Sequence, residues 1–73
     1  MTTDSEPLKL QINGAPQTVR GPMTVHELLA DLGVDPRQVA VERNRQIVSK
    51  SDYLDTRLCD GDQLEIVTFV GGG

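Results

Sequence analysis

The stretch "MTVHELLADLG", residues 23–33, carries the strongest local signal in this chain. Thr24, followed three residues later by Glu27, makes a capping box, the pattern with which many helices begin. Gly33 suits the left-handed position that follows a helix. Between them, four apolar residues recur at the spacing of one helical face: Val25, Leu28, Leu29 and Leu32. The stretch therefore predicts one short helix with a single apolar face, which needs a partner layer.

Two strands are predicted before this helix. Apolar residues alternate with polar ones over 8–12, the period of a half-buried strand. Asn13 and Gly14 follow, the strongest short signal for a hairpin, so 15–20 should be the returning strand. Pro16 has no N–H to donate, which places that returning strand at an edge of the sheet.

Three more strands are predicted after the helix. Residues 39–48 indicate strand, turn and strand, with Asn44 suited to the left-handed residue of the turn. Segment 49–59 is irregular, and apolar side chains are expected to anchor it: Tyr53, Leu54 and Leu58. A turn at 60–62 leads to the last strand, 63–70, which is apolar enough to lie centrally, parallel to the first strand.

This order predicts an α+β domain with a mixed sheet of about five strands and the helix packed on one face. A chain of 73 residues is one domain at most. We expect 8–70 to form it, with 1–7 and 71–73 as flexible tails. A domain of this size buries only ~60% of its unfolded surface, so a deep pocket is not expected.

The last strand is apolar on both of its faces. Leu64 and Ile66 share one face, whereas Val67 and Phe69 share the other. Because a single helix covers a single face, we expect Val67 and Phe69 to be exposed, and exposed apolar patches mark partner surfaces. The alternative is that a loop or the N-terminal segment covers them.

Charge and composition exclude several classes of partner. Seven basic and eleven acidic residues give a net charge of −4, which argues against nucleic acid. No apolar run approaches the ~20 residues of a membrane span, and the first ten residues lack the features of a signal peptide. A single cysteine, Cys59, allows no internal disulfide. We therefore expect a cytoplasmic protein that binds neither nucleic acid nor membrane.

No catalytic group is recognisable within the domain. His26 lies among the capping residues of the helix, and Cys59 has no second cysteine nearby. An acidic set lacks the spacing of a calcium loop: Asp52, Asp55, Asp60, Asp62 and Glu65. We expect no catalytic residue, no metal site and no bound cofactor.

The chain ends on three glycines, Gly71, Gly72 and Gly73, whose only reactive group is the carboxylate of Gly73. An α-carboxyl has a pKa of ~3.5, so this group is ionised at neutral pH. A carboxylate becomes a nucleophile when a partner enzyme orients it, and a tail without side chains can thread a narrow channel. The ending favours a carrier; an inert flexible tail or a cloning remnant are the alternatives.

Four stretches resemble the ThiS family, sulfur carriers of thiamine thiazole synthesis with a ubiquitin-like β-grasp fold: residues 10–16, 24–33, 39–48 and the ending "LCDGDQLEIVTFVGGG", residues 58–73. The resemblance covers 8–73. It implies that Gly73 is adenylated with ATP by an E1-like, ThiF-type enzyme and becomes a thiocarboxylate. Gly71 and Gly72 would thread the partner's active site. An apolar face would meet the partners: Ala40, Val67 and Phe69.

The same resemblance implies two further partners and leaves alternatives. A cysteine desulfurase would supply sulfur, and a ThiG-type thiazole synthase would accept it. Related carriers serve molybdopterin synthesis, where two prolines more often precede the glycines, or tRNA thiolation. Outside the carriers, the chain could be a ubiquitin-like modifier whose Gly73 joins lysines, or a plain binding module with an inert tail.

Overall fold

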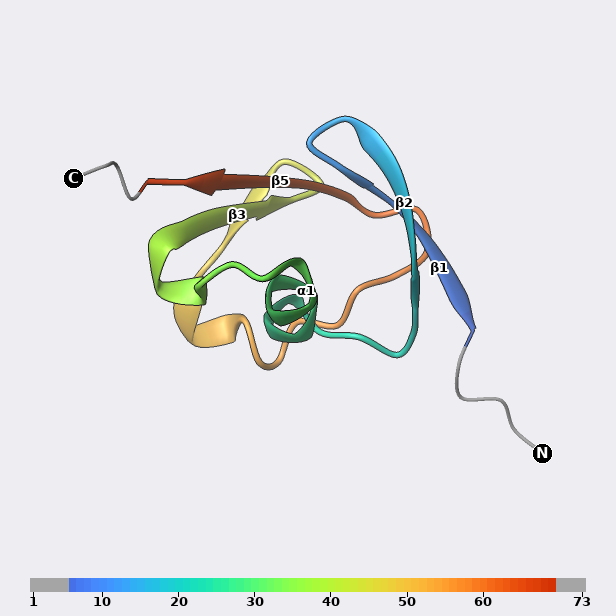
Figure 1. The fold of residues 1–73 in the computed structure, drawn as a ribbon, viewed down its shortest axis with the longest axis horizontal. Helices are drawn as coiled ribbons and strands as arrows, with labels where there is room; N and C mark the ends of the chain where they lie inside the picture. The colour runs from blue at the N-terminus through green and yellow to red at the C-terminus, as the bar shows by residue number, and fades with distance from the viewer. Residues whose placement is uncertain (1–5, 70–73) are drawn as a thin grey trace.

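The computed structural model describes residues 6–69 and shows a five-stranded sheet with one helix beneath it (Figure 1). The strands are β1 Pro7–Ile12, β2 Ala15–Arg20, β3 Val39–Arg43, β4 Gln46–Val48 and β5 Gln63–Thr68. The helix is α1 Val25–Leu32, and two short 3₁₀ helices are η1 Pro36–Gln38 and η2 Lys50–Asp52. The predicted α+β architecture is confirmed.

The strands lie in the order β2-β1-β5-β3-β4. β5 is central: it runs parallel to β1, with Ile12 beside Leu64, and antiparallel to β3, with Ala40 beside Val67. β2, which contains Pro16, is an edge strand as predicted. The last strand of the chain is therefore held on both sides, and its direction sets where the described chain ends, at Phe69.

Helix α1 begins and ends where the sequence predicts. The hydroxyl Oγ1 of Thr24 accepts a hydrogen bond from the N–H of Glu27 at 3.1 Å, and Oε1 of Glu27 accepts one from the N–H of Thr24 at 2.9 Å. Gly33 ends the helix with φ of 76°. The apolar face of α1 packs under the sheet through Val25, Leu28 and Leu29, all buried.

Replacing Thr24 with alanine should lower the free energy of unfolding by about 1 kcal/mol, because the N–H of Glu27 loses its acceptor. Chemical denaturation followed by circular dichroism measures this. Thr24→Ser keeps the hydroxyl and serves as the control, with an expected change of a few tenths of a kcal/mol. Equal stability of the alanine variant and the native chain would show that the cap contributes nothing.

The core confirms two of the three predicted anchors of segment 49–59. Tyr53 and Leu58 are buried, and the hydroxyl of Tyr53 donates to the carbonyl of Val39 at 3.2 Å. The prediction for Leu54 was wrong, since 66% of its surface is exposed. Tyr53 follows η2 in helical geometry, where consecutive side chains diverge by about 100°. Tyr53 points inward, and Leu54 therefore points away from the core.

The N-terminal boundary differs slightly from the sequence pattern. β1 begins at Pro7, one residue before the predicted strand, and the carbonyl of Glu6 accepts a hydrogen bond from the N–H of Gly21. A proline is tolerated as the first residue of a strand. Of the two predicted tails, residues 1–5 and 71–73 lie outside the described residues. Within 6–69, no helix is long and apolar enough to span a membrane.

Candidate functional site at the end of β5

The face of the sheet that α1 leaves uncovered, called the open face below, carries the predicted apolar patch. Leu64 of β5 points into the core, whereas Val67 and Phe69 are 56% and 54% exposed. Ala40 of β3 lies directly beside Val67 and is also exposed. The predicted exposure of Val67 and Phe69 is confirmed, and the sheet register brings Ala40 to the same place.

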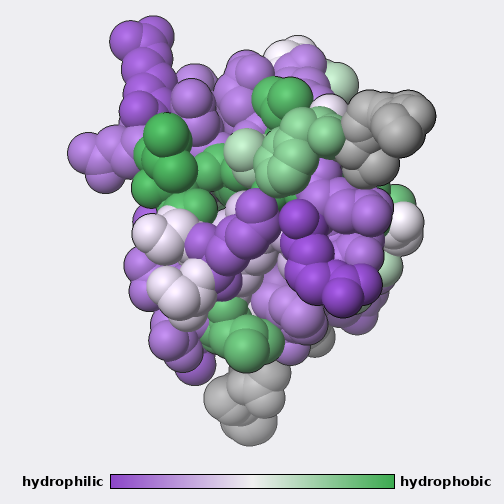
Figure 2. Space-filling model, turned by 90° about the vertical axis from the view of Figure 1, so that its left-hand side faces the viewer, coloured by the Kyte–Doolittle hydropathy of each residue, from purple (hydrophilic) through white to green (hydrophobic). Residues whose placement is uncertain are grey.

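Ile47 extends this patch and was missed in the sequence. It lies on β4 directly beside Glu42 of β3, on the open face, and is 78% exposed. Alternation could have identified it, because its neighbour Val48 packs against the core. Figure 2 views the molecule from the end where β5 leaves the sheet. Most of the apolar surface in this view lies in the upper part, a second apolar group lies at the bottom, and hydrophilic residues separate the two.

Phe69 is anchored although its ring is half exposed. Its N–H donates to the carbonyl of Gln38 at 3.0 Å, which continues the pairing of β5 with β3 by one residue. Nζ of Lys50 lies 4.7 Å from the centroid of the Phe69 ring, within cation–π range. The described chain thus ends at a fixed position on the open face. The functional residue predicted from sequence, Gly73, lies four residues further on, outside the described residues.

Two asparagines in hairpin turns hold β5 from both sides. Asn13, with φ of 52°, exchanges two side-chain hydrogen bonds with the backbone of Ile66, at 2.7 and 3.1 Å. Oδ1 of Asn44, also with φ of 52°, accepts from the N–H of Gln63 at 3.0 Å. The sequence predicted turns at both places, but these bonds to β5 depend on the tertiary structure.

Asp62 organises the start of β5. Only 5% of the surface of this residue is exposed. Its carboxylate accepts three hydrogen bonds, from Arg43 Nε at 2.8 Å, Asn44 Nδ2 at 3.1 Å and the N–H of Cys59 at 2.8 Å. Burial raises the pKa of Asp62, but these three donors together outweigh burial and hold its pKa below the usual 3.8. Asp62 is therefore ionised, and its hydrogen bonds with Arg43 and Asn44 connect the β3–β4 hairpin to the start of β5.

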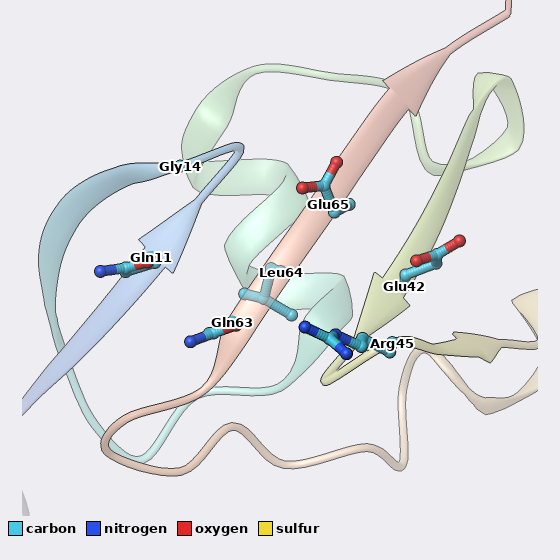
Figure 3. A pocket seen from close by; sticks show the side chains of 7 residues that line it. All are labelled: Gln11, Gly14, Glu42, Arg45, Gln63, Leu64 and Glu65. Atoms are coloured by element: carbon cyan, nitrogen blue, oxygen red, sulfur yellow. The ribbon is translucent and has the colours of Figure 1, made fainter.

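The open face also has a shallow hollow of about 330 Å³ beside the start of β5. Figure 3 shows the residues that line it, most of which have polar side chains. The residues that line it are Gln11, Gly14, Glu42, Arg45, Gln63, Leu64 and Glu65. The hollow lies on the sheet surface rather than between the sheet and α1, so it suits contact with another surface better than enclosure of a small molecule.

The titratable residues considered in the sequence do not assemble into a catalytic group. His26 lies on the first turn of α1, and its backbone N–H donates to the carbonyl of Tyr53. Cys59 is exposed, with Sγ 3.9 Å from Nη2 of Arg43. Among residues 6–69, no three His, Cys, Asp or Glu side chains are placed to hold a metal ion. The features of the described domain that could serve a function are therefore the open face of the sheet and the end of β5 at Phe69.

Comparison with known proteins shows the family to which this chain is similar. Residues 10–73 match the ThiS family. The sulfur carrier protein ThiS of Bacillus subtilis is 43% identical over 65 residues, which are 88% of this chain and 98% of that protein. A thiazole synthase of Paramagnetospirillum magneticum is 56% identical over 66 residues, 90% of this chain but only 20% of that protein. The chain thus spans about one fifth of that relative.

A solved structure supports the fold. The crystal structure of the thiamine biosynthesis protein (ThiS) from Geobacter metallireducens superimposes with a TM-score of 0.77 and 38% sequence identity, covering 90% of this chain and all of that one. The mixed sheet with one helix on one face is the ubiquitin-like β-grasp fold.

Proposed function

This chain belongs to the ThiS family of sulfur carriers in thiamine biosynthesis, and from that premise we propose that its Gly73 carboxylate carries the sulfur. A partner enzyme of the E1-like, ThiF type activates Gly73 with ATP. A cysteine desulfurase supplies sulfur as a persulfide, and a ThiG-type thiazole synthase accepts it. The chain itself acts as a carrier on which these enzymes work, in the cytoplasm, and it binds no cofactor of its own.

The proposed chemistry takes place at the carboxyl group of Gly73. The carboxylate of Gly73 attacks the α-phosphorus of ATP, which forms an acyl adenylate and releases pyrophosphate. Sulfide sulfur then attacks the acyl carbon, and AMP leaves. If the sulfur comes from a persulfide, its attack gives an acyl disulfide. A thiol then attacks the outer sulfur of this disulfide, which releases the thiocarboxylate and joins the thiol to the donor cysteine in a new disulfide. Activation is needed because a carboxylate at neutral pH is ionised and resists nucleophilic attack.

The observation that supports this proposal most strongly is the anchored end of β5. Asn13, Asn44 and the backbone of Gln38 fix the last strand up to Phe69. Four residues then separate Phe69 from the reactive carboxylate, and a chain of that length reaches at most ~14 Å. When a partner binds the open face, the Gly73 carboxylate therefore lies no more than ~14 Å from Phe69, within reach of an active site beside that face.

Intact mass spectrometry tests the proposal. The chain is incubated with ATP, the cognate adenylating enzyme and a sulfide source, and we expect the mass gain of one sulfur-for-oxygen exchange. Omission of ATP is the control and should leave the mass unchanged. No exchange with a demonstrably active enzyme would contradict the carrier chemistry. Higher-mass conjugates to lysines in lysate, without exchange, would instead favour a protein modifier.

Phe69→Ala should weaken binding of the adenylating enzyme about tenfold while lowering the free energy of unfolding by no more than about 1.5 kcal/mol. The half-exposed ring has more apolar surface to offer a partner than it contributes to the core. Titration calorimetry and chemical denaturation measure the two effects.

Leu54→Ala is the matched control for Phe69→Ala, since Leu54 is an exposed apolar residue outside the open face. Its binding should stay within a factor of two of the native chain. A core-sized loss of about 3 to 5 kcal/mol for Phe69→Ala would contradict the assignment, because it would show that the ring supports the fold.

A further inference from the structure

Lys50 presents a primary amine at the anchored end of β5. Its Nζ lies 4.7 Å from the centre of the Phe69 ring. The backbone of Lys50 is fixed, because its carbonyl accepts a hydrogen bond from the N–H of Tyr53 at 3.2 Å and Tyr53 is buried. Lys50 itself is exposed, so its amine can leave the ring and meet another group. The last described residue therefore has a nucleophilic side chain beside it.

The distance from this amine to Phe69 suits a ring closure with the C-terminus. The centre of the Phe69 ring is about 4 Å from its Cα, given carbon–carbon bonds of ~1.5 Å, so Nζ of Lys50 lies within about 9 Å of that Cα. Val70 and three glycines follow, and an unconstrained glycine-rich segment of four residues averages ~10–12 Å from end to end. Effective concentration is highest when the length of a linker matches the span that it bridges, and it reaches the millimolar range.

The other amine and the thiol of the described chain lie too far away. The sequence has one further lysine, Lys9, and one cysteine, Cys59. The carbonyl of Lys9 accepts a hydrogen bond from the N–H of Gly61, which places Lys9 and Cys59 before the start of β5, at the opposite end of the strand from Phe69 (Figure 1). The eight residues from Gly61 to Phe69 span ~26 Å at ~3.3 Å per residue. A segment of four residues reaches only ~14 Å, too little even with a lysine side chain added.

We propose that Lys50 is an internal acceptor for the activated C-terminus. Once the Gly73 adenylate leaves the enzyme without having met sulfur, the Lys50 amine attacks its carbonyl carbon. A bond forms from Nζ to this carbon, the bond from the carbon to the phosphate oxygen breaks, AMP leaves with the electron pair, and the ammonium gives two protons to water. The proposal rests on the activation of Gly73 proposed above. The product is a ring without a free C-terminal carboxylate, so it cannot be activated again.

Mass spectrometry of the chain with ATP and the adenylating enzyme, but without a sulfur source, tests the proposal. We expect a product lighter than the native chain by one water, and no such product when ATP is omitted. Trypsin should then leave one branched peptide, because the new amide blocks cleavage after Lys50 and joins residues 46–57 to residues 58–73. Tandem mass spectrometry of this peptide locates the new amide.

Two arginine variants that keep the net charge serve as the comparison. Lys50→Arg should lower the yield of the lighter product at least tenfold, because a guanidinium stays protonated and has no free electron pair for the attack. It also keeps a cation beside the Phe69 ring. Lys9→Arg is the matched control, since Lys9 is also exposed, and its yield should stay within a factor of two of that of the native chain.

Three results would overturn the proposal. Release of pyrophosphate with no loss of water would show that the adenylate forms but does not react with Lys50. A new amide at Lys9 or at the N-terminus, or an undiminished yield from Lys50→Arg, would show that the geometry at Phe69 does not select the acceptor. No release of pyrophosphate by a demonstrably active enzyme would contradict the proposed function, and this inference with it.

Discussion

Removal of Gly73 should slow the sulfur-dependent mass gain at least a hundredfold, to below detection in an assay that the native chain completes. The shortened chain still ends in a glycine carboxylate, that of Gly72, but this group lies one residue, about 3.5 Å, nearer to the anchored Phe69. Displacement of a reacting atom by even 1 Å can cost a hundredfold in rate. The effect comes from position and not from loss of a functional group.

Deletion of residues 2–5 is the matched control for removal of Gly73. It shortens the other end of the chain, where the proposal assigns no function, and should leave the mass gain unchanged. Both truncated chains should melt within a few degrees of the native chain, because neither deletion removes a described core residue. A truncated chain without Gly73 that gains sulfur at the native rate would contradict the assignment.

Asp62→Ala should lower the free energy of unfolding by about 3 kcal/mol, the largest effect on stability that we expect from the site. Three donors lose their acceptor at once: the guanidinium of Arg43, the amide of Asn44 and the N–H of Cys59. Hydrogen bonds to a charged group contribute about 1.5 to 3 kcal/mol, and the substitution also leaves the partly buried guanidinium of Arg43 without its partner. Chemical denaturation at neutral pH measures the loss.

The same carboxylate predicts how stability depends on pH. Because the pKa of Asp62 is lower in the folded chain than its usual 3.8, the folded state favours the ionised form. The resulting stabilisation is fully present above the unfolded pKa of ~3.9 and is lost as the pH falls through the folded value. Asp62→Asn should lack this part of the acid sensitivity, so its stability should fall less than that of the native chain below about pH 4.

Asp55→Ala is the control for both measurements on Asp62. Asp55 is exposed, and substitution of such a residue usually changes stability by no more than about 0.5 kcal/mol. If Asp62→Ala were equally mild, the hydrogen bonds of Asp62 would be replaceable by water. An unchanged acid sensitivity in Asp62→Asn would show that other carboxylates dominate.

The sequence alone determined the elements whose signals are local. The capping box of Thr24 and Glu27 placed the start of α1, and Gly33 placed its end. The turn at Asn13 and Gly14 placed the first hairpin. Each of these signals depends on backbone geometry and hydrogen bonds within a few residues, so a short stretch of sequence is enough to predict it. The alternation of β5 likewise predicted that Val67 and Phe69 would be exposed.

Only the tertiary structure decided what depends on the distance between strands. The side chains of Asn13 and Asn44 bind β5, and Lys50 covers the ring of Phe69. The opposed Glu42 and Glu65 meet only in the register of β3 with β5, which a slip of one residue would abolish. Such contacts join residues far apart in sequence, and their energy exists only after the whole sheet has assembled, so no local pattern encodes them.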